Sequence, residues 1–168
     1  KPLGKKTRTI RVDTLARVEG EGALRIELVG GRAERVELQL FEPPRFFEAF
    51  LRGRSRTEVP DITARICGVC PVVHTLTSLK ALESALKIGV LEQTVLLRKL
   101  MMMGQILNSH ALHLFFFSLS DFFSFDNDLT LIKKFPSRAH DALLLRDFGN
   151  KLIEVIGGRS IHPLTPTL

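Results

Sequence analysis

The chain has 168 residues, of which 45% are hydrophobic and 25% charged, enough to bury one sizeable core and too few to indicate two domains. Its formal net charge of +6 comes from basic residues that alternate with acids beyond the first eight positions. The sequence lacks the basic stripe with interleaved aromatic residues that nucleic-acid binding needs. We therefore expect a single unit, residues 1–168, that does not bind nucleic acid.

Residues 1–43 are predicted to form mainly β-strands. Two adjacent glycines at positions 30 and 31 favour a tight turn, so residues 23–29 and 33–41 are expected to pair as an antiparallel hairpin. Apolar side chains occur at every second position of three stretches, the period of a strand with one buried face. These side chains are Ile10 and Val12, then Leu24, Ile26 and Leu28, then Val36, Leu38 and Leu40.

Residues 44–168 are predicted to form mainly helices. Pro43 and Pro44 are expected to start a short helix that carries residues 46–51 and ends before Gly53, and helical periodicity and stop signals place further helices at about residues 71–86, 91–117 and 137–156. On the helix at 91–117, one apolar stripe is expected to face the core. Its members are Leu96, Leu100, Met103, Leu107, Ala111 and Leu114. The predicted fold class is α+β: a small N-terminal antiparallel sheet followed by a bundle of long helices, part of a larger fold.

One stretch without a formal charge, residues 100–120, is long enough to span a bilayer as a helix. Polar side chains interrupt it, among them Gln105, Asn108, His110 and His113. Such groups are expensive in hydrocarbon, whereas a helix buried in a larger protein can satisfy them with hydrogen bonds. We expect a buried core helix and no membrane span, with His110 and His113 as core residues rather than metal ligands.

Residues 65–74, RICGVCPVVH, contain both cysteines of the chain. The C-x-x-C spacing can turn the sulfurs of Cys67 and Cys70 toward one point, and Gly68 is expected to let the backbone fold tightly enough to do so. The same spacing gives poor geometry for a structural disulfide. His74 lies about one helical turn after Cys70, so its imidazole can reach back toward that sulfur.

The residues around this motif also favour a reactive loop. Asp61 or Thr63 is a candidate cap for the segment that leads into it, and Pro71 suits the first turn of the helix that follows. Unpaired amides at that helix start would stabilise thiolates, and Arg65 would add positive charge. The cysteine usage favours a reducing compartment.

Four interpretations compete for such a cysteine pair. A structural zinc site takes four ligands, so it would need histidines at unpromising spacing or another chain. A thioredoxin-like redox pair needs a βαβ context that is not evident, and two merely packed cysteines would not need this Arg, Gly, Pro and His setting. The fourth interpretation is half of a thiolate-rich transition-metal site. The spacing alone supports the zinc site and the half site about equally.

Two motifs resemble signatures of the large, active-site subunit of nickel-iron hydrogenases. Residues 65–74 look like its N-terminal cysteine motif, and residues 17–22, RVEGEG, resemble the signature near its start. Residues 42–54 are most similar to the cytoplasmic, NAD(P)-linked branch of the family, often named sulfhydrogenases. Residues 109–113 and 157–163 also resemble the family, so the resemblance covers essentially the whole chain.

The resemblance implies an activity and a metal centre. The activity is reversible cleavage of dihydrogen into protons and electrons, at a nickel that sulfur bridges to an iron carrying cyanide and carbon monoxide. By similarity, Cys67 is a terminal nickel ligand, Cys70 bridges nickel and iron, and His74 hydrogen-bonds the bridging sulfur. Arg65 belongs to the same motif and is a further candidate site residue.

Two carboxylates also take roles from the resemblance. Glu19 aligns with the acid that begins the proton path, a role that its chemistry suits. Glu48 falls where the family places a ligand of a structural magnesium or similar ion. An ordinary surface acid is the alternative for both residues.

Complete large subunits are more than twice as long and end with a second two-cysteine motif, which supplies the other two sulfurs. Residues 1–168 contain no such motif. Alone, this chain is therefore expected to be inactive, as a fragment, as part of a split subunit or as a degenerate homologue.

The resemblance also implies partners. No residue here can carry electrons onward, so a small subunit with iron-sulfur clusters is expected, followed in the NAD(P)-linked branch by flavin-bearing subunits. A Phe-rich surface between Phe41 and Phe50 would suit the small-subunit interface, and a cytoplasmic location is expected. The rival functions are a noncatalytic scaffold in a redox complex and a small zinc-binding interaction module.

Overall fold

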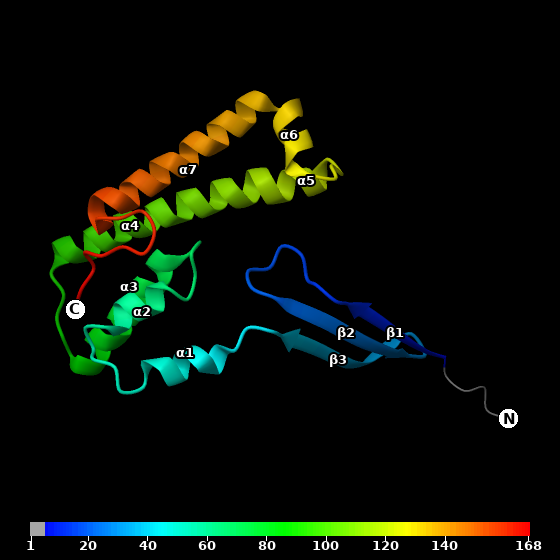
Figure 1. The fold of residues 1–168 in the computed structure, drawn as a ribbon, viewed down its shortest axis with the longest axis horizontal. Helices are drawn as coiled ribbons and strands as arrows, with labels where there is room; N and C mark the ends of the chain where they lie inside the picture. The colour runs from blue at the N-terminus through cyan, green and yellow to red at the C-terminus, as the bar shows by residue number, and fades with distance from the viewer. Residues whose placement is uncertain (1–5) are drawn as a thin grey trace. The chain divides into compact units, whose positions relative to one another are not determined.

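The chain divides into two compact units, Lys1–Ala49 and Phe50–Leu168. The computed structural model describes residues 6–168 (Figure 1). At Pro44 it describes the backbone but not the side chain. Residues 1–5, which the strand prediction included, lie outside the described residues. Strands occupy the first unit and most of the helices belong to the second, so the predicted α+β fold class is confirmed.

The N-terminal unit contains a three-stranded antiparallel sheet in the order β1-β2-β3. Its strands are β1 (Thr7–Val12), β2 (Gly22–Val29) and β3 (Arg32–Leu40). Gly30 and Gly31 connect β2 to β3 with positive φ angles of 59° and 83°, which glycine adopts without the steric penalty of a Cβ. The predicted hairpin is therefore confirmed.

Apolar residues share one face of this sheet, because directly paired residues of neighbouring strands point to the same side. Leu24 of β2 pairs with Val12 of β1 and with Leu38 of β3. Within residues 6–168 much of this face remains exposed, at 58% for Leu38 and 61% for Val36. The predicted alternation is present, but the described residues leave β3 largely uncovered.

Helices follow the sheet, and the cysteine-bearing segment lies between two of them. They are α1 (Pro44–Leu51), α2 (Val59–Ala64), α3 (Pro71–Leu86), α4 (Glu92–Ala111), the π-helical turn η1 (Leu112–Ser118), α5 (Leu119–Phe122), α6 (Asp128–Lys134) and α7 (Pro136–Gly157). The short helix predicted after the two prolines and the helix predicted at 71–86 are confirmed. Helix α7 ends at Gly157, and its C-cap Gly158 has a φ of 76°, as the two glycines predicted.

The helix expected over residues 91–117 is present, but α4 ends at Ala111 and the rest is the π-helical turn η1. The predicted cap is wrong. Asp61 and Thr63 lie inside α2, whose N-cap position is Glu58. The sequence prediction also missed α6, which begins after Asn127, whose side chain accepts a hydrogen bond from the Thr130 amide at 3.0 Å.

The predicted core stripe of α4 is confirmed at Ala111 and wrong at its other members. Leu96 and Leu100 are 52% and 47% exposed, and the buried positions of α4 are Met101, Gly104, Gln105 and Ala111. The reason is the close approach of α4 to α7, which run side by side in Figure 1. Small residues line the contact, since a Cβ on Gly104 would lie 2.7 Å from the Gly149 carbonyl oxygen.

His110 and His113 are exposed rather than in the core, so that part of their prediction is wrong. Each ring nevertheless has a hydrogen-bond partner. The Nδ1 atom of His110 contacts the Ile106 carbonyl at 2.9 Å, and that of His113 contacts the Ser118 hydroxyl at 3.3 Å. Over residues 6–168, the structure contains no helix with both the length and the apolar character needed to cross a bilayer.

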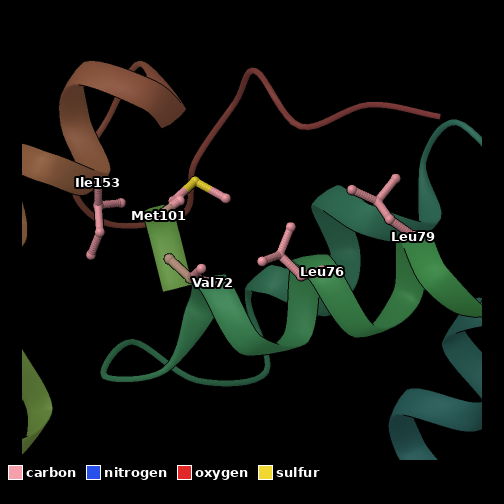
Figure 2. Packing of buried hydrophobic residues seen from close by; sticks show 5 residues of the cluster. All are labelled: Val72, Leu76, Leu79, Met101 and Ile153. Atoms are coloured by element: carbon pink, nitrogen blue, oxygen red, sulfur yellow. The ribbon is translucent and has the colours of Figure 1, made fainter. Parts of the chain in front are cut away.

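The larger unit packs around a cluster that joins α3, α4 and α7 (Figure 2). Val72 and Leu79 of α3 and Met101 of α4 are fully buried, and Ile153 of α7 is 1% exposed. Leu76 completes the cluster between Val72 and Leu79. Since Val72 lies two residues after Cys70, this core fixes the start of the helix that follows the cysteines.

Candidate metal centre

The cysteine loop, residues 65–70, connects the end of α2 to the start of α3. The amides of Arg65 and Ile66 donate to the carbonyls of Ile62 and Thr63, both at 3.1 Å, which completes the last turn of α2. Pro71 then occupies the first position of α3, where the missing N–H costs nothing. Both cysteines therefore lie between two helix ends.

Cys67, Cys70 and His74 converge. One ligand atom from each residue, the two Sγ atoms and a ring nitrogen, lie within 4.8 Å of one another. Cys67 is 8% exposed, while Cys70 and His74 are half-buried. The two cysteines do not form a disulfide. Among residues 6–168, this is the one cluster of at least three His, Cys, Asp or Glu side chains close enough to share a metal ion.

The donor set fits a transition metal. Two thiolates and an imidazole are ligands that nickel, iron and zinc accept, whereas magnesium and calcium prefer oxygen. Three donors leave a four-coordinate ion incomplete, so any such ion would take further ligands from outside the cluster. The N-terminus of α3 adds a favourable field for the negative charge of the thiolates.

One peptide unit of the loop is hydrogen-bonded on both sides. The amide of Cys70 donates to the Sγ atom of Cys67 at 3.2 Å. The carbonyl oxygen of the same peptide unit, which belongs to Val69, accepts from Nε2 of Gln105 at 2.7 Å. Gln105 is 3% exposed. In the sequence, the only signal for Gln105 is that it interrupts an apolar stretch with a polar side chain.

A second contact reaches the loop from the far end of the chain. The ring of His162 donates from Nδ1 to the carbonyl of Ala64, the last residue of α2, at 2.9 Å. His162 has a positive φ of 54°, a conformation uncommon for residues other than glycine. The segment after α7 therefore supports the end of α2, where the loop begins, although His162 has no predicted role beyond its place in a family-like motif.

Arg65 and Gly68 behave differently from expectation. The Arg65 guanidinium turns back along α2, where it pairs with the Asp61 carboxylate and donates to the Asp61 carbonyl at 2.7 Å. Its positive charge is therefore shared with an acid. A Cβ on Gly68 would meet nothing within 4 Å, and its φ is not positive, so the described residues do not require glycine there. The end of α2 and the start of α3 make the turn instead.

Glu19 and Glu48 belong to the other unit, Lys1–Ala49. Glu19 lies in the segment between β1 and β2, and Glu48 lies in α1; both are exposed. Their roles in proton transfer and magnesium binding stay predictions.

Residues 45–141 match the family of nickel-dependent hydrogenases. The chain belongs to this family. The matched residues include the cluster of Cys67, Cys70 and His74, together with Gln105. The N-terminal sheet lies outside the matched range.

This hydrogenase-family chain is similar to subunits of known hydrogenases. It is 39% identical to the alpha subunit of sulfhydrogenase 2 from Pyrococcus furiosus, over 91% of this chain and 37% of that subunit. It is also 39% identical to a vhu subunit of the F420-non-reducing hydrogenase from Methanocaldococcus jannaschii, over 93% of this chain and 39% of the relative. The chain thus spans less than half the length of these curated relatives.

Solved structures share the fold. The structure of an NAD+-reducing [NiFe]-hydrogenase in its H2-reduced state has a TM-score of 0.82 and 37% identity, over 95% of this chain and 37% of that one. A [NiFeSe]-hydrogenase from Dm. baculatum has a TM-score of 0.69 at 24% identity, covering 94% of this chain and 37% of that one. The second likeness shows the fold alone.

Proposed function

We propose that the complete protein containing this chain is the active-site subunit of a nickel-iron hydrogenase, which oxidises dihydrogen reversibly to protons and electrons. The observation that carries this proposal is the convergence of Cys67, Cys70 and His74 within 4.8 Å in a chain of the nickel-dependent hydrogenase family. A cluster of two soft thiolates and an imidazole is suited to nickel and iron. The other two sulfur ligands would come from outside residues 1–168.

Each member of the cluster has a proposed part. Cys67 would hold nickel as a terminal ligand, Cys70 would bridge nickel to iron, and His74 would hydrogen-bond the bridging sulfur. When bound, the nickel and the iron with its cyanide and carbon monoxide ligands would supply the chemistry that splits dihydrogen. The chain's own part is to keep both sulfurs ionised and aimed at one point, which the helix start at Pro71 and the Cys70 amide favour.

Further residues outside the cluster would serve the same reaction. Glu19 would accept the proton and begin its path to solvent. Glu48 would bind a structural magnesium ion. Arg65 remains a candidate site residue, and its ion pair with Asp61 would hold the end of α2 against the loop.

The partners follow from the need to remove electrons. We propose a small subunit with iron-sulfur clusters, followed by flavin-bearing subunits that use NAD(P), and a cytoplasmic location. Support comes from the likeness to an NAD+-reducing hydrogenase and to a sulfhydrogenase subunit. Phe41 and Phe46, at 58% and 57% exposed, supply apolar surface for such a docking site.

Metal analysis of the complete native complex tests the proposal. We expect nickel and iron in equal amounts at this site, after subtraction of the iron in clusters of the partner subunits. Zinc without nickel would indicate the interaction module instead. A complex in which this polypeptide holds no metal would indicate the noncatalytic scaffold.

A further inference from the structure

The peptide unit between Val69 and Cys70 connects Gln105 to a metal-ligating sulfur. Its oxygen accepts from Nε2 of Gln105 at 2.7 Å, and its N–H donates to Sγ of Cys67 at 3.2 Å. A peptide unit is planar, so fixing the direction of its C=O also fixes the direction of its N–H. Gln105 therefore sets where the Cys70 amide points.

The orientation of the Gln105 amide follows from its partner. A carbonyl oxygen cannot donate, so the group facing Val69 must be the NH2 group of Gln105. The opposite atom, Oε1, is buried and has no hydrogen-bond partner among residues 6–168. Leaving such an acceptor unpaired is costly, and the side chain is 3% exposed. Gln105 thus keeps the contact with Val69 although its other atom is unsatisfied.

The hydrogen bond from Gln105 to the Val69 carbonyl also strengthens the hydrogen bond from the Cys70 amide to the Cys67 sulfur. Hydrogen bonds in a chain polarise one another, so a bond accepted by the peptide oxygen makes its N–H a better donor. Hydrogen bonds to sulfur ligands lower their electron donation to the metal and adjust its reduction potential.

We propose that Gln105 is a positioning residue of the metal centre, which acts on the Cys67 sulfur through the peptide unit of Val69 and Cys70. The part concerning the metal rests on the proposed function. Gln105 touches neither substrate nor metal in this proposal. Its effect is to hold the loop against α4 and to strengthen one N–H donor to a ligand sulfur.

A pair of variants in the complete protein separates this role from ordinary packing. Gln105→Met keeps a similar length and volume and removes the donor. Asn108→Leu is the matched control, because its amide donates to Asn150 at 2.7 Å and accepts from Arg146 at 3.0 Å, both on α7. It removes an amide from the same helix without touching the loop. Gln105→Asn, one methylene shorter, serves as a second variant if Gln105→Met does not accumulate.

The first measurement is amide hydrogen exchange of residues 65–70 in the metal-free complete protein. We expect exchange roughly tenfold faster in Gln105→Met, as for the loss of a buried hydrogen bond, and unchanged loop exchange in Asn108→Leu. Equal loop exchange in Gln105→Met and the unmodified protein would overturn the proposal. Because no metal is present, this result does not depend on the proposed function.

The second measurement is the midpoint potential of nickel in the assembled complex, followed by electron paramagnetic resonance. Loss of an N–H donor makes the Cys67 sulfur more electron-rich, so Gln105→Met should shift the potential to more negative values while Asn108→Leu does not. An unshifted potential together with faster loop exchange would reject the effect on sulfur. Absence of nickel from the unmodified complex would refute the proposed function itself.

Discussion

The two units of the chain differ in how much of their apolar surface they bury by themselves. In the sheet, every residue of β1 is exposed, and Gly22 and Ala23 of β2 are the buried strand residues within the described range. In the helical unit, Val72 and Met101 are completely buried, and residues from three helices form one cluster (Figure 2). An antiparallel sheet with an apolar face that remains accessible needs another surface to cover it.

The difference matters because the cysteine loop is fixed to the unit that packs itself. Val72 enters the buried cluster two residues after Cys70, and Gln105 reaches the loop from α4 one turn after Met101. The ligand atoms can therefore converge without contributions from the sheet. Glu19 belongs to the other unit, which contains the sheet.

The largest expected effect comes from removing a sulfur from the helical unit. Cys70→Ser in the assembled enzyme replaces a soft thiolate by a hydroxyl that stays protonated and binds nickel poorly. Hydrogen-dependent dye reduction should fall by more than about 100-fold, beyond the loss seen when only a supporting contact is removed. Nickel content should fall with it. Retained activity would exclude Cys70 as a ligand of the metal centre. The helical unit would then not have its proposed role of holding the ligand sulfurs.

A paired substitution compares the interiors of the two units directly. Leu79→Ala empties a fully buried position of α3 and should lower the free energy of unfolding by about 3 kcal/mol. Leu38→Ala, at a position 58% exposed on β3, should change it by less than about 0.5 kcal/mol. Urea unfolding of residues 1–168, followed by circular dichroism, measures both. Equal losses of unfolding free energy in the two variants would mean that the sheet face is covered as completely as the helical core.

Much of the fold was predictable because local patterns determine it. The period-two alternation indicated the three strands, and Gly30 and Gly31 indicated the turn between two of them. Pro71 and Gly158 marked helix ends correctly. The buried face of α4 was not predictable in this way. Helical periodicity locates an apolar stripe, but the contact with α7 is made by Gly104 and Gly149, which no hydrophobicity pattern marks.

The candidate site was predictable in part, for a similar reason. The C-x-x-C spacing with a histidine one turn later is local, and the structure brings Cys67, Cys70 and His74 together. The contacts that hold the loop are not local. Gln105 and Val69 are 36 residues apart, and His162 and Ala64 are 98 apart. Such partners become visible only when the helices are packed.

The smallest expected effect concerns the close approach that lets the helical unit bury itself. A Cβ at Gly149 would lie 2.5 Å from the backbone carbonyl oxygen of Gly104 and 2.9 Å from the backbone nitrogen of Asn108. Backbone atoms cannot move away as a flexible side chain can. Gly149→Ala should therefore push α4 and α7 apart and cost roughly 2 kcal/mol, despite the better helix propensity of alanine.

Gly89 provides the matched control, since a Cβ there meets nothing within 4 Å and its φ is not positive. Gly89→Ala should leave the free energy of unfolding unchanged or raise it by about 0.5 kcal/mol, because alanine restricts the unfolded chain. The two substitutions add the same methyl group, so opposite signs in the same urea titration would isolate the helix contact as the cause. A tolerated Gly149→Ala would show that α4 and α7 can separate without cost, and their glycine contact would then not be part of what distinguishes the helical unit from the sheet.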